Sequence, residues 1–415
     1  MSATLVALAA VVAVAEPEPL PWRHTLFLQF DGASLTWVPS PDEENAALGL
    51  SFLSKFEGSE IPAYDGDAAD RQAVVDAVRG HFAGAGVRVV DERPPEWVPY
   101  TMAVVGGQWD DTAATSFTRG TAPEVDCERL NQRHVVFAFV SSTEPSVQQA
   151  TTISQEAGHA WGLDHVLGDG LVMSYDFAAL VSEFSDGCVP LCEEACQGRD
   201  SIYCEAVHAD FCDEGMQDSW AELLYTFGDD TLDEASPTVD FLHPTEGDVF
   251  PPGEDLLVDV DVTDDYGGVG WRFELRVDGR EVASQTAFER ELQWPLASLP
   301  EGAYELRIIA EDHADHVTMA SVAFEVGEVA ADSTGAGGTT ATDASSTPSW
   351  ANADDSTGAA AGDDSGGGCT CRADAPPLGA LSYGWLVLVA GWRRRRVRVR
   401  PLQRDDTTTG EHDDG

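Results

Sequence analysis

The residues from Gln155 to His165 combine side-chain types and spacings that suit metal-assisted hydrolysis. On a helix, Gln155 and His159 lie one turn apart on the same face, so both side chains can reach one metal ion. Glu156 comes next to them, where a carboxylate can take a proton from metal-bound water. Gly162 lets the chain leave the helix sharply, so that His165 can return as a third ligand. The segment therefore predicts a metal centre with a general base.

A methionine and a tyrosine follow in Val172-Met173-Ser174-Tyr175. Together the two segments resemble the metzincin zinc peptidases, whose signature is H-E-x-x-H-x-x-G-x-x-H followed by a Met-turn. The Met-Ser-Tyr form is closest to the serralysin-type turn. The resemblance covers roughly residues 24–235. It implies an endopeptidase that uses Zn²⁺ to activate water and hydrolyse bonds in a protein or peptide substrate.

The resemblance also implies a role for each matching residue. Glu156 would be the general base, and His159 and His165 would be zinc ligands. Met173 would form the hydrophobic floor beneath the metal. Tyr175 would be a catalytic residue, either as a fifth ligand or as a donor to the tetrahedral intermediate.

Gln155 departs from the family pattern, which has histidine as the first ligand. A glutamine oxygen has about the right reach, but it is neutral and a weaker donor than imidazole toward zinc. His134 on the preceding strand is one spatial substitute. Two other hypotheses remain besides the enzyme. The protein could be an inactive pseudopeptidase that acts as a surface binding or adhesion protein, or a purely structural surface protein.

Alternating strands and helices must position this site. The apolar periodicity predicts a mixed sheet with an active-site helix, followed by a β-sandwich, and so an α+β fold. We expect the edge strand that would hold a peptide to lie within residues 107–133. The predicted strands cover 24–31, 87–90, 100–105 and 134–140, and the predicted helices cover 67–84, 146–161 and 220–227.

The pattern changes at Ser236-Pro237, after which short alternating runs are separated by turn residues such as Asp278-Gly279. Residues 236–327 therefore predict an all-β sandwich, and they resemble bacterial Ig-like surface modules. The carboxylate pairs Glu193-Glu194 and Asp264-Asp265 are expected to be solvated surface.

Six cysteines lie in the first domain, and their even number predicts three disulfides in an oxidising compartment. A zinc cluster is the rival interpretation, because three of them recur every four residues. The pairing cannot be read from the sequence. The six are Cys127, Cys188, Cys192, Cys196, Cys204 and Cys212.

The two ends of the chain predict export. Residues 1–15 have the apolar core and small-x-small site of a secretory signal. Residues 328–368 are an acidic Gly/Ser/Thr linker. Residues 369–404, with two cysteines, an apolar stretch and an arginine cluster, resemble the MYXO-CTERM sorting tail. That resemblance implies a membrane segment, processing by a sorting protease and delivery to the cell surface.

The charge balance excludes one class of partner. The chain has 415 residues, and its 73 acidic and 23 basic side chains give a formal net charge of -50. Such a field repels phosphate backbones, so nucleic acid is not an expected partner. The acidity also raises calcium binding as an interpretation, but the sequence contains neither an EF-hand loop nor a glycine-rich nonapeptide repeat.

Overall fold

The computed structural model describes residues 22–127, 131–176, 179–192, 202–287, 291–296 and 298–328. All of them belong to one compact unit. Few helices and many strands make up these residues, so the α+β class is confirmed. Within the described ranges, no helix has the length and apolar character needed to cross a membrane. The predicted signal peptide, the sorting tail and the linker beyond residue 328 lie outside them.

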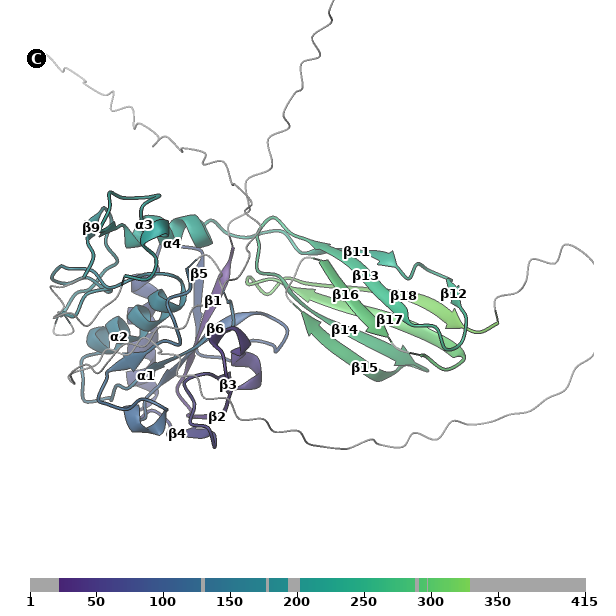
Figure 1. Ribbon diagram of the computed structural model, residues 1–415, viewed down its shortest axis with the longest axis horizontal. Helices are drawn as coiled ribbons and strands as arrows, with labels where there is room; N and C mark the ends of the chain where they lie inside the picture. The colour runs from purple at the N-terminus through teal and green to yellow at the C-terminus, as the bar shows by residue number, and fades with distance from the viewer. Residues whose placement is uncertain are drawn as a thin grey trace, which may run out of the picture. The chain divides into compact units, whose positions relative to one another are not determined.

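A five-stranded sheet forms the centre of the first domain (Figure 1). Four strands are parallel, and the short edge strand β7 runs antiparallel to β8. Apart from the edge strand β5, the strands are almost entirely buried, as expected for parallel strands covered on both faces. β7 falls within the range expected for the edge strand. The order is β5 (Val87–Val90), β1 (His24–Gln29), β6 (Tyr100–Val105), β8 (Val135–Ala138) and β7 (Gly120–Thr121).

Two helices cover one face of this sheet. Helix α1 (Ala68–His81) and helix α2 (Ser146–Ala160) contribute to the same buried apolar cluster as alternate residues of the central strands. Asp67 caps α1, because its carboxylate accepts hydrogen bonds from two backbone amides of the first turn. The predicted helices at 67–84 and 146–161 are therefore confirmed, and α1 ends three residues earlier than its apolar pattern predicts.

The other face packs on a small sheet that the sequence did not reveal. Strands β2 (Ala33–Trp37), β3 (Leu50–Ser51) and β4 (Ser59–Ile61) form it, and each is too short to show a clear period. Leu35 and Ile61 join the second apolar cluster beneath the central sheet. Three short 3-10 helices accompany this region: Pro41–Glu43, Ala46–Leu48 and Trp109–Asp111.

Disulfides hold the last part of the first domain. Cys127 is bonded to Cys204 and Cys188 to Cys212, and Cys192 is also disulfide-bonded. The prediction of disulfides is confirmed, and a zinc cluster on Cys188 and Cys192 is wrong, because their sulfur atoms are already bonded. The elements here are β9 (Val189–Pro190), α3 (Glu205–His208), β10 (Met216–Gln217) and α4 (Ser219–Phe227).

Residues 238–326 form a β-sandwich of two sheets around their own apolar cluster. The hairpin turn at Asp278-Gly279 has positive φ at both residues, as a tight two-residue hairpin requires. Strands β12, β15 and β16 were not predicted. One sheet contains β11 (Thr238–His243), β13 (Leu256–Thr263) and β16 (Glu291–Leu296), and the other contains β12 (Val249–Phe250), β18 (Val317–Val326), β17 (Gly302–Glu311), β14 (Gly270–Val277) and β15 (Arg280–Ala287).

We predict that the Cys127–Cys204 disulfide stabilises the first domain more than Cys188–Cys212 does. The bonded cysteines are 77 and 24 residues apart. Loop-closure entropy gives about 4.5 and about 3.4 kcal/mol for loops of these lengths. Urea unfolding should therefore show a larger loss for Cys127→Ser/Cys204→Ser than for Cys188→Ser/Cys212→Ser. The reverse order would contradict the prediction.

Candidate metal centre

Helix α2 is enclosed along most of its length, since every side chain from Gln149 to Ala160 is buried. Buried polar groups are normally hydrogen-bonded. Most on this helix are: Gln149 Oε1 accepts from the Tyr64 hydroxyl at 2.8 Å, and the Ser154 hydroxyl lies 2.9 Å from a histidine nitrogen. The exceptions are at Gln155 and Glu156, where three side-chain oxygens have no hydrogen-bond partner.

The Gln155 amide is held in one orientation. Its Nε2 donates to the backbone carbonyls of Val172, at 2.9 Å, and Ser174, at 2.8 Å. Only the NH₂ group can donate, so the amide cannot be turned around. This leaves Oε1 buried and without a hydrogen bond. The Oε1 atom of Gln155 could therefore serve as a metal ligand, while its Nε2 atom fixes the turn around Met173.

Glu156 lies against the edge strand β7. A methyl group added at Gly120 would lie 2.7 Å from Glu156 Cγ, so the strand and the carboxylate are in close contact. Neither carboxylate oxygen accepts a hydrogen bond, and burial raises the pKa of Glu156 well above its usual value. An ionised carboxylate at this position needs a positive charge nearby.

The two histidines point their outer nitrogens at each other. His159 Nε2 lies 3.1 Å from His165 Nε2. His159 Nδ1 lies 2.7 Å from the carbonyl oxygen of Leu163, so it must be the protonated nitrogen, which leaves a lone pair on Nε2. Burial lowers the pKa of both imidazoles, and the neighbouring His159 lowers that of His165 further. Neutral imidazoles are the form that binds metal.

These donors fit a zinc ion. Two imidazole nitrogens at about 2.05 Å from a tetrahedral zinc are separated by about 3.3 Å. The observed 3.1 Å between the Nε2 atoms of His159 and His165 is close to that value. Gln155 Oε1, one helical turn before His159, is a buried oxygen without a hydrogen bond, and the buried Glu156 carboxylate has no cation beside it in the described residues.

The chain around the histidines turns as the sequence predicts. Gly162 has a φ of +93°, a left-handed conformation that a side chain would strain. Met173 is buried beneath the helix, and a methyl group added at Gly158 would lie 2.7 Å from its sulfur. Val166 N donates to Met173 O at 2.9 Å, which ties the segment after His165 to the methionine turn.

Tyr175 lies on the exposed side of the site. Its ring stacks on His165 with centroids 4.4 Å apart, and its hydroxyl is 3.5 Å from His165 Nδ1. The tyrosine is 37% exposed, whereas Gln155 and Glu156 are at most 1% exposed. Its hydroxyl is therefore next to a candidate ligand, on a residue that is partly exposed to solvent.

His134 does not replace the missing histidine. Its Nδ1 is 3.1 Å from a carboxylate oxygen of Glu44, and its Nε2 is 3.4 Å from one of Asp126. Burial lowers its pKa, but hydrogen bonds to Asp126 and Glu44 outweigh burial and raise the pKa to about 9. His134 is thus a charged member of a buried ion-pair cluster, and the substitute-ligand hypothesis is wrong.

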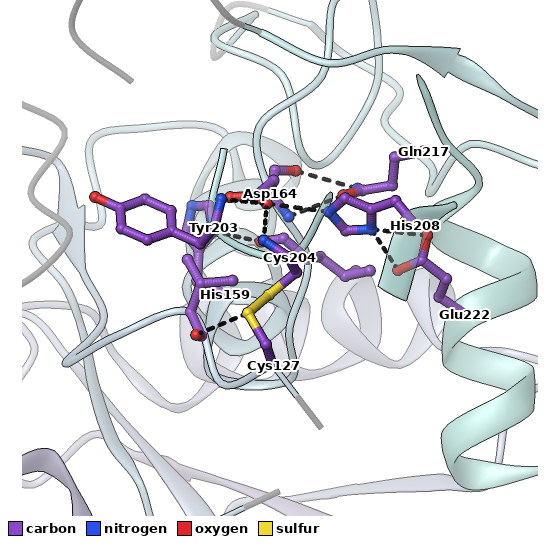
Figure 2. Close-up of a disulfide and its surroundings, with 10 residues drawn as sticks. Cys127, His159, Asp164, Tyr203, Cys204, His208, Gln217 and Glu222 are labelled. Atoms are coloured by element: carbon purple, nitrogen blue, oxygen red, sulfur yellow. Dashed lines mark hydrogen bonds and ion pairs between the residues drawn. A yellow bond between two sulfur atoms is a disulfide. The ribbon is translucent and has the colours of Figure 1, made fainter. Parts of the chain in front are cut away.

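A buried network behind His165 was missed by sequence reasoning. Asp164 Oδ2 accepts from the backbone amides of Tyr203, at 2.9 Å, and Cys204, at 2.8 Å. The same oxygen is 3.0 Å from His208 Nε2. On its other side, His208 Nδ1 is 2.9 Å from Glu222 (Figure 2). The position of Asp164, directly before His165, was the only signal in the sequence.

Comparisons with known proteins identify the second domain. Residues 237–308 match the family model of the bacterial Ig domain, which confirms the predicted Ig-like module. Bacterial Ig domains are typical of extracellular surface proteins. No curated protein is significantly similar to the chain.

The chain also has weak likenesses to solved structures. The fibronectin(III)-like modules of Clostridium thermocellum CbhA are 29% identical over 22% of this chain and 46% of theirs, with a TM-score of 0.18. CopC from Methylosinus trichosporium OB3b is 19% identical over 21% of this chain and 93% of its own, with a TM-score of 0.18. The chain thus spans less than half the length of the CbhA chain it matches. At such TM-scores these likenesses carry no conclusion about fold or function.

We predict that His208 stabilises the domain in a pH-dependent way. Burial lowers its pKa, but hydrogen bonds to Asp164 and Glu222 outweigh burial and raise it to about 9, above the usual 6.5. Its contribution is therefore complete below pH 6.5 and is lost as pH rises through 9. His208→Ala should cost about 3–5 kcal/mol at pH 6, because it leaves buried carboxylates unpaired.

Urea unfolding of both proteins from pH 6 to pH 9.5 tests this. The difference between wild type and His208→Ala should shrink as pH rises. Comparing the two proteins at each pH cancels the titration of His134. A difference that stays constant across the range would show that His208 is not charged in the folded state.

Proposed function

We propose that this protein is an exported, surface-anchored, zinc-dependent endopeptidase of the metzincin type. One observation carries the proposal: the Nε2 atoms of His159 and His165 are 3.1 Å apart, and the buried carboxylate next to His159 in the helix has no partner. Buried carboxylates that serve only the fold normally find hydrogen-bond partners. Two neutral imidazoles, an amide oxygen and a carboxylate form a set that suits metal-assisted hydrolysis.

Different side chains would bind the metal and transfer the proton. His159, His165 and the Oε1 atom of Gln155 would hold the zinc ion. When bound, zinc lowers the pKa of a water molecule and polarises a carbonyl group. The positive charge would also bring the raised pKa of Glu156 down, so that its carboxylate could accept a proton from the attacking water. Glu156 would then pass that proton to the leaving amine.

The edge strand β7 would position the substrate. β7 ends the sheet order and pairs on one side with β8, and its Gly120 is in contact with Glu156. An extended peptide that pairs with such an edge is held by main-chain hydrogen bonds. This would place a peptide bond beside the general base. The exposed hydroxyl of Tyr175 would donate to the oxygen of the attacked carbonyl.

The alternative is a pseudopeptidase that binds partner surfaces without cleavage. Gln155 favours it, because its amide already joins the helix to the methionine turn through two hydrogen bonds. The fold therefore does not need an ion to hold these elements together. A neutral amide oxygen is also a weaker zinc donor than imidazole.

Both the peptidase and the pseudopeptidase would be exported proteins. The disulfides and the bacterial Ig domain support an oxidising location outside the cell. The predicted signal at 1–15 would direct export. The tail at 369–404 would anchor the chain in the membrane until a sorting protease processed it.

We predict that the wild-type protein binds zinc and hydrolyses casein. Gln155→His should raise zinc affinity at least about tenfold, because it supplies a third imidazole. Glu156→Gln should retain zinc and lose casein hydrolysis by a factor of about 10² or more, because the base is removed. Zinc content by mass spectrometry and casein hydrolysis should be measured on the same samples.

Gln148→His is the matched control, since it makes the same change on the same helix two turns earlier. It should alter neither zinc content nor activity. Wild type without zinc or activity, together with a gain of both in Gln155→His, would establish the pseudopeptidase. Activity that survived in Glu156→Gln would exclude the assigned mechanism.

We also predict that Gly120→Ala lowers kcat without removing zinc. The added methyl group would lie 2.7 Å from Glu156 Cγ, so the carboxylate must move. Misplacing a catalytic group by about 1 Å costs on the order of 10²-fold in rate. Gly80→Ala is the control, because no atom lies within 4 Å of the added methyl group. Equal kcat values for the two variants would argue against Glu156 as the base.

A further inference from the structure

Five ionisable residues gather at one end of the β-sandwich. Asp233 precedes β11, Asp264 and Asp265 follow β13, and Asp312 and His316 flank the turn between β17 and β18. We refer to these five residues as the aspartate cluster. A short loop carries the chain from β13 in one sheet to β14 in the other, which brings the ends of both sheets together.

The cluster is compact. The ligand atoms of Asp233, Asp264 and Asp265 all lie within 4.8 Å of one another. The same holds for Asp233, Asp312 and His316. Asp233 belongs to both groups and therefore lies at the centre. Two oxygens on opposite sides of a calcium ion are about 4.8 Å apart, so this spacing suits one shared ion.

The central carboxylates have no hydrogen-bond partners. The side chain of Asp233 is only 5% exposed, and neither of its oxygens accepts a hydrogen bond. Both oxygens of Asp264 are likewise buried and without a hydrogen bond. The sequence had predicted a solvated surface for the Asp264-Asp265 pair, and for the Asp264 oxygens that prediction is wrong. Four buried acceptor atoms thus lack a hydrogen bond of good geometry, although the nearby backbone amides of Ala235 and Asp265 partly offset the rise that burial causes in the pKa values of Asp233 and Asp264.

His316 is the basic member of the cluster, and Arg88, which pairs with Asp315, also acts on Asp312 through its charge. His316 Nδ1 is 2.9 Å from Asp312 Oδ2 and 4.0 Å from Asp233 Oδ1. Asp312 is otherwise fixed by the backbone amides of Ala314 and His316, at 2.8 and 2.9 Å. None of the four aspartates forms an ion pair with an arginine in the described ranges.

Burial, together with mutual repulsion, raises the pKa values of two members of the cluster. Burial raises the pKa of Asp264 to about 7. The backbone amide of Asp265 lowers this pKa, and the charges of Asp233, Asp312 and Asp265 raise it. Burial also raises the pKa of Asp233, again with help from the neighbouring aspartates. Carboxylates that are this close together, with buried oxygens that lack hydrogen bonds, are costly as they stand, and a bound cation would remove the cost.

We propose that the aspartate cluster is a calcium site, with Asp233, Asp264, Asp265 and Asp312 supplying carboxylate oxygens. Calcium takes six to eight oxygen ligands in a flexible geometry, and water would complete the set. Zinc prefers nitrogen and sulfur donors, and the Nδ1 atom of His316 already faces Asp312. Magnesium dehydrates reluctantly and demands a near-ideal octahedron.

The site would link a connecting segment to the sandwich. Asp233 lies five residues before β11, whereas the other ligands come from loops between strands. An ion shared between them would hold the segment that enters β11 against the sandwich end. Calcium would then stabilise the domain from its first strand onward.

Calorimetric titration of the full chain with CaCl₂, after treatment with EDTA and dialysis, tests the proposal. We expect one calcium ion to bind with a Kd on the order of 10⁻⁴ M, as in extracellular modules, and to raise the Tm. Asp264→Asn and Asp233→Asn should each weaken binding at least about tenfold, because each removes a charged ligand.

Two controls make the result specific. Asp240→Asn, on the exposed face of β11, should bind calcium like wild type. His159→Ala should also bind calcium normally, so that this site is separated from the proposed zinc site. The proposal is overturned by an absence of heat and Tm change in wild type. Unchanged affinity in both Asp264→Asn and Asp233→Asn, or equal affinity for MgCl₂, would overturn it too.

Discussion

The enclosure of helix α2 is the constraint on which the rest of the structure depends. Its side chains are buried from residue 149 to residue 160, although many of them are polar. Each buried polar group must find a partner or remain at a cost of about 1–3 kcal/mol. Neighbouring elements supply those partners for most of the helix. The unsatisfied oxygens at Gln155 and Glu156 are conspicuous because the rest of the helix is so well paired.

The sequence predicted the elements whose residues alternate clearly or follow a helical period. The central strands, both main helices and most sandwich strands were found because each buries a regular apolar pattern. Strands of two or three residues, such as β3 and β4, were missed because they carry no period and are formed by tertiary contacts. In the candidate site, short-range spacing identified His159, Glu156 and His165.

What the sequence could not show depends on distant parts of the chain. Asp164 and His208 are 44 residues apart, yet they share a buried hydrogen bond. Asp264 and Asp312 lie on different loops, and no local pattern marks them as neighbours. Desolvation is also invisible in a sequence: the same aspartate is harmless in water and costly when enclosed. The sequence therefore did not reveal those parts of either candidate metal centre that depend on burial by distant segments.

The loop closed by Cys127 and Cys204 has a consequence for when the candidate centre can form. Gln155, His159, His165, Met173 and Tyr175 all lie between the two cysteines. The backbone amide of Cys204 also donates to Asp164, directly beside His165. A newly made chain in a reducing cytoplasm lacks this covalent frame. Under the proposed function, the candidate centre would therefore be completed by oxidation only after the chain has left the cell that makes it.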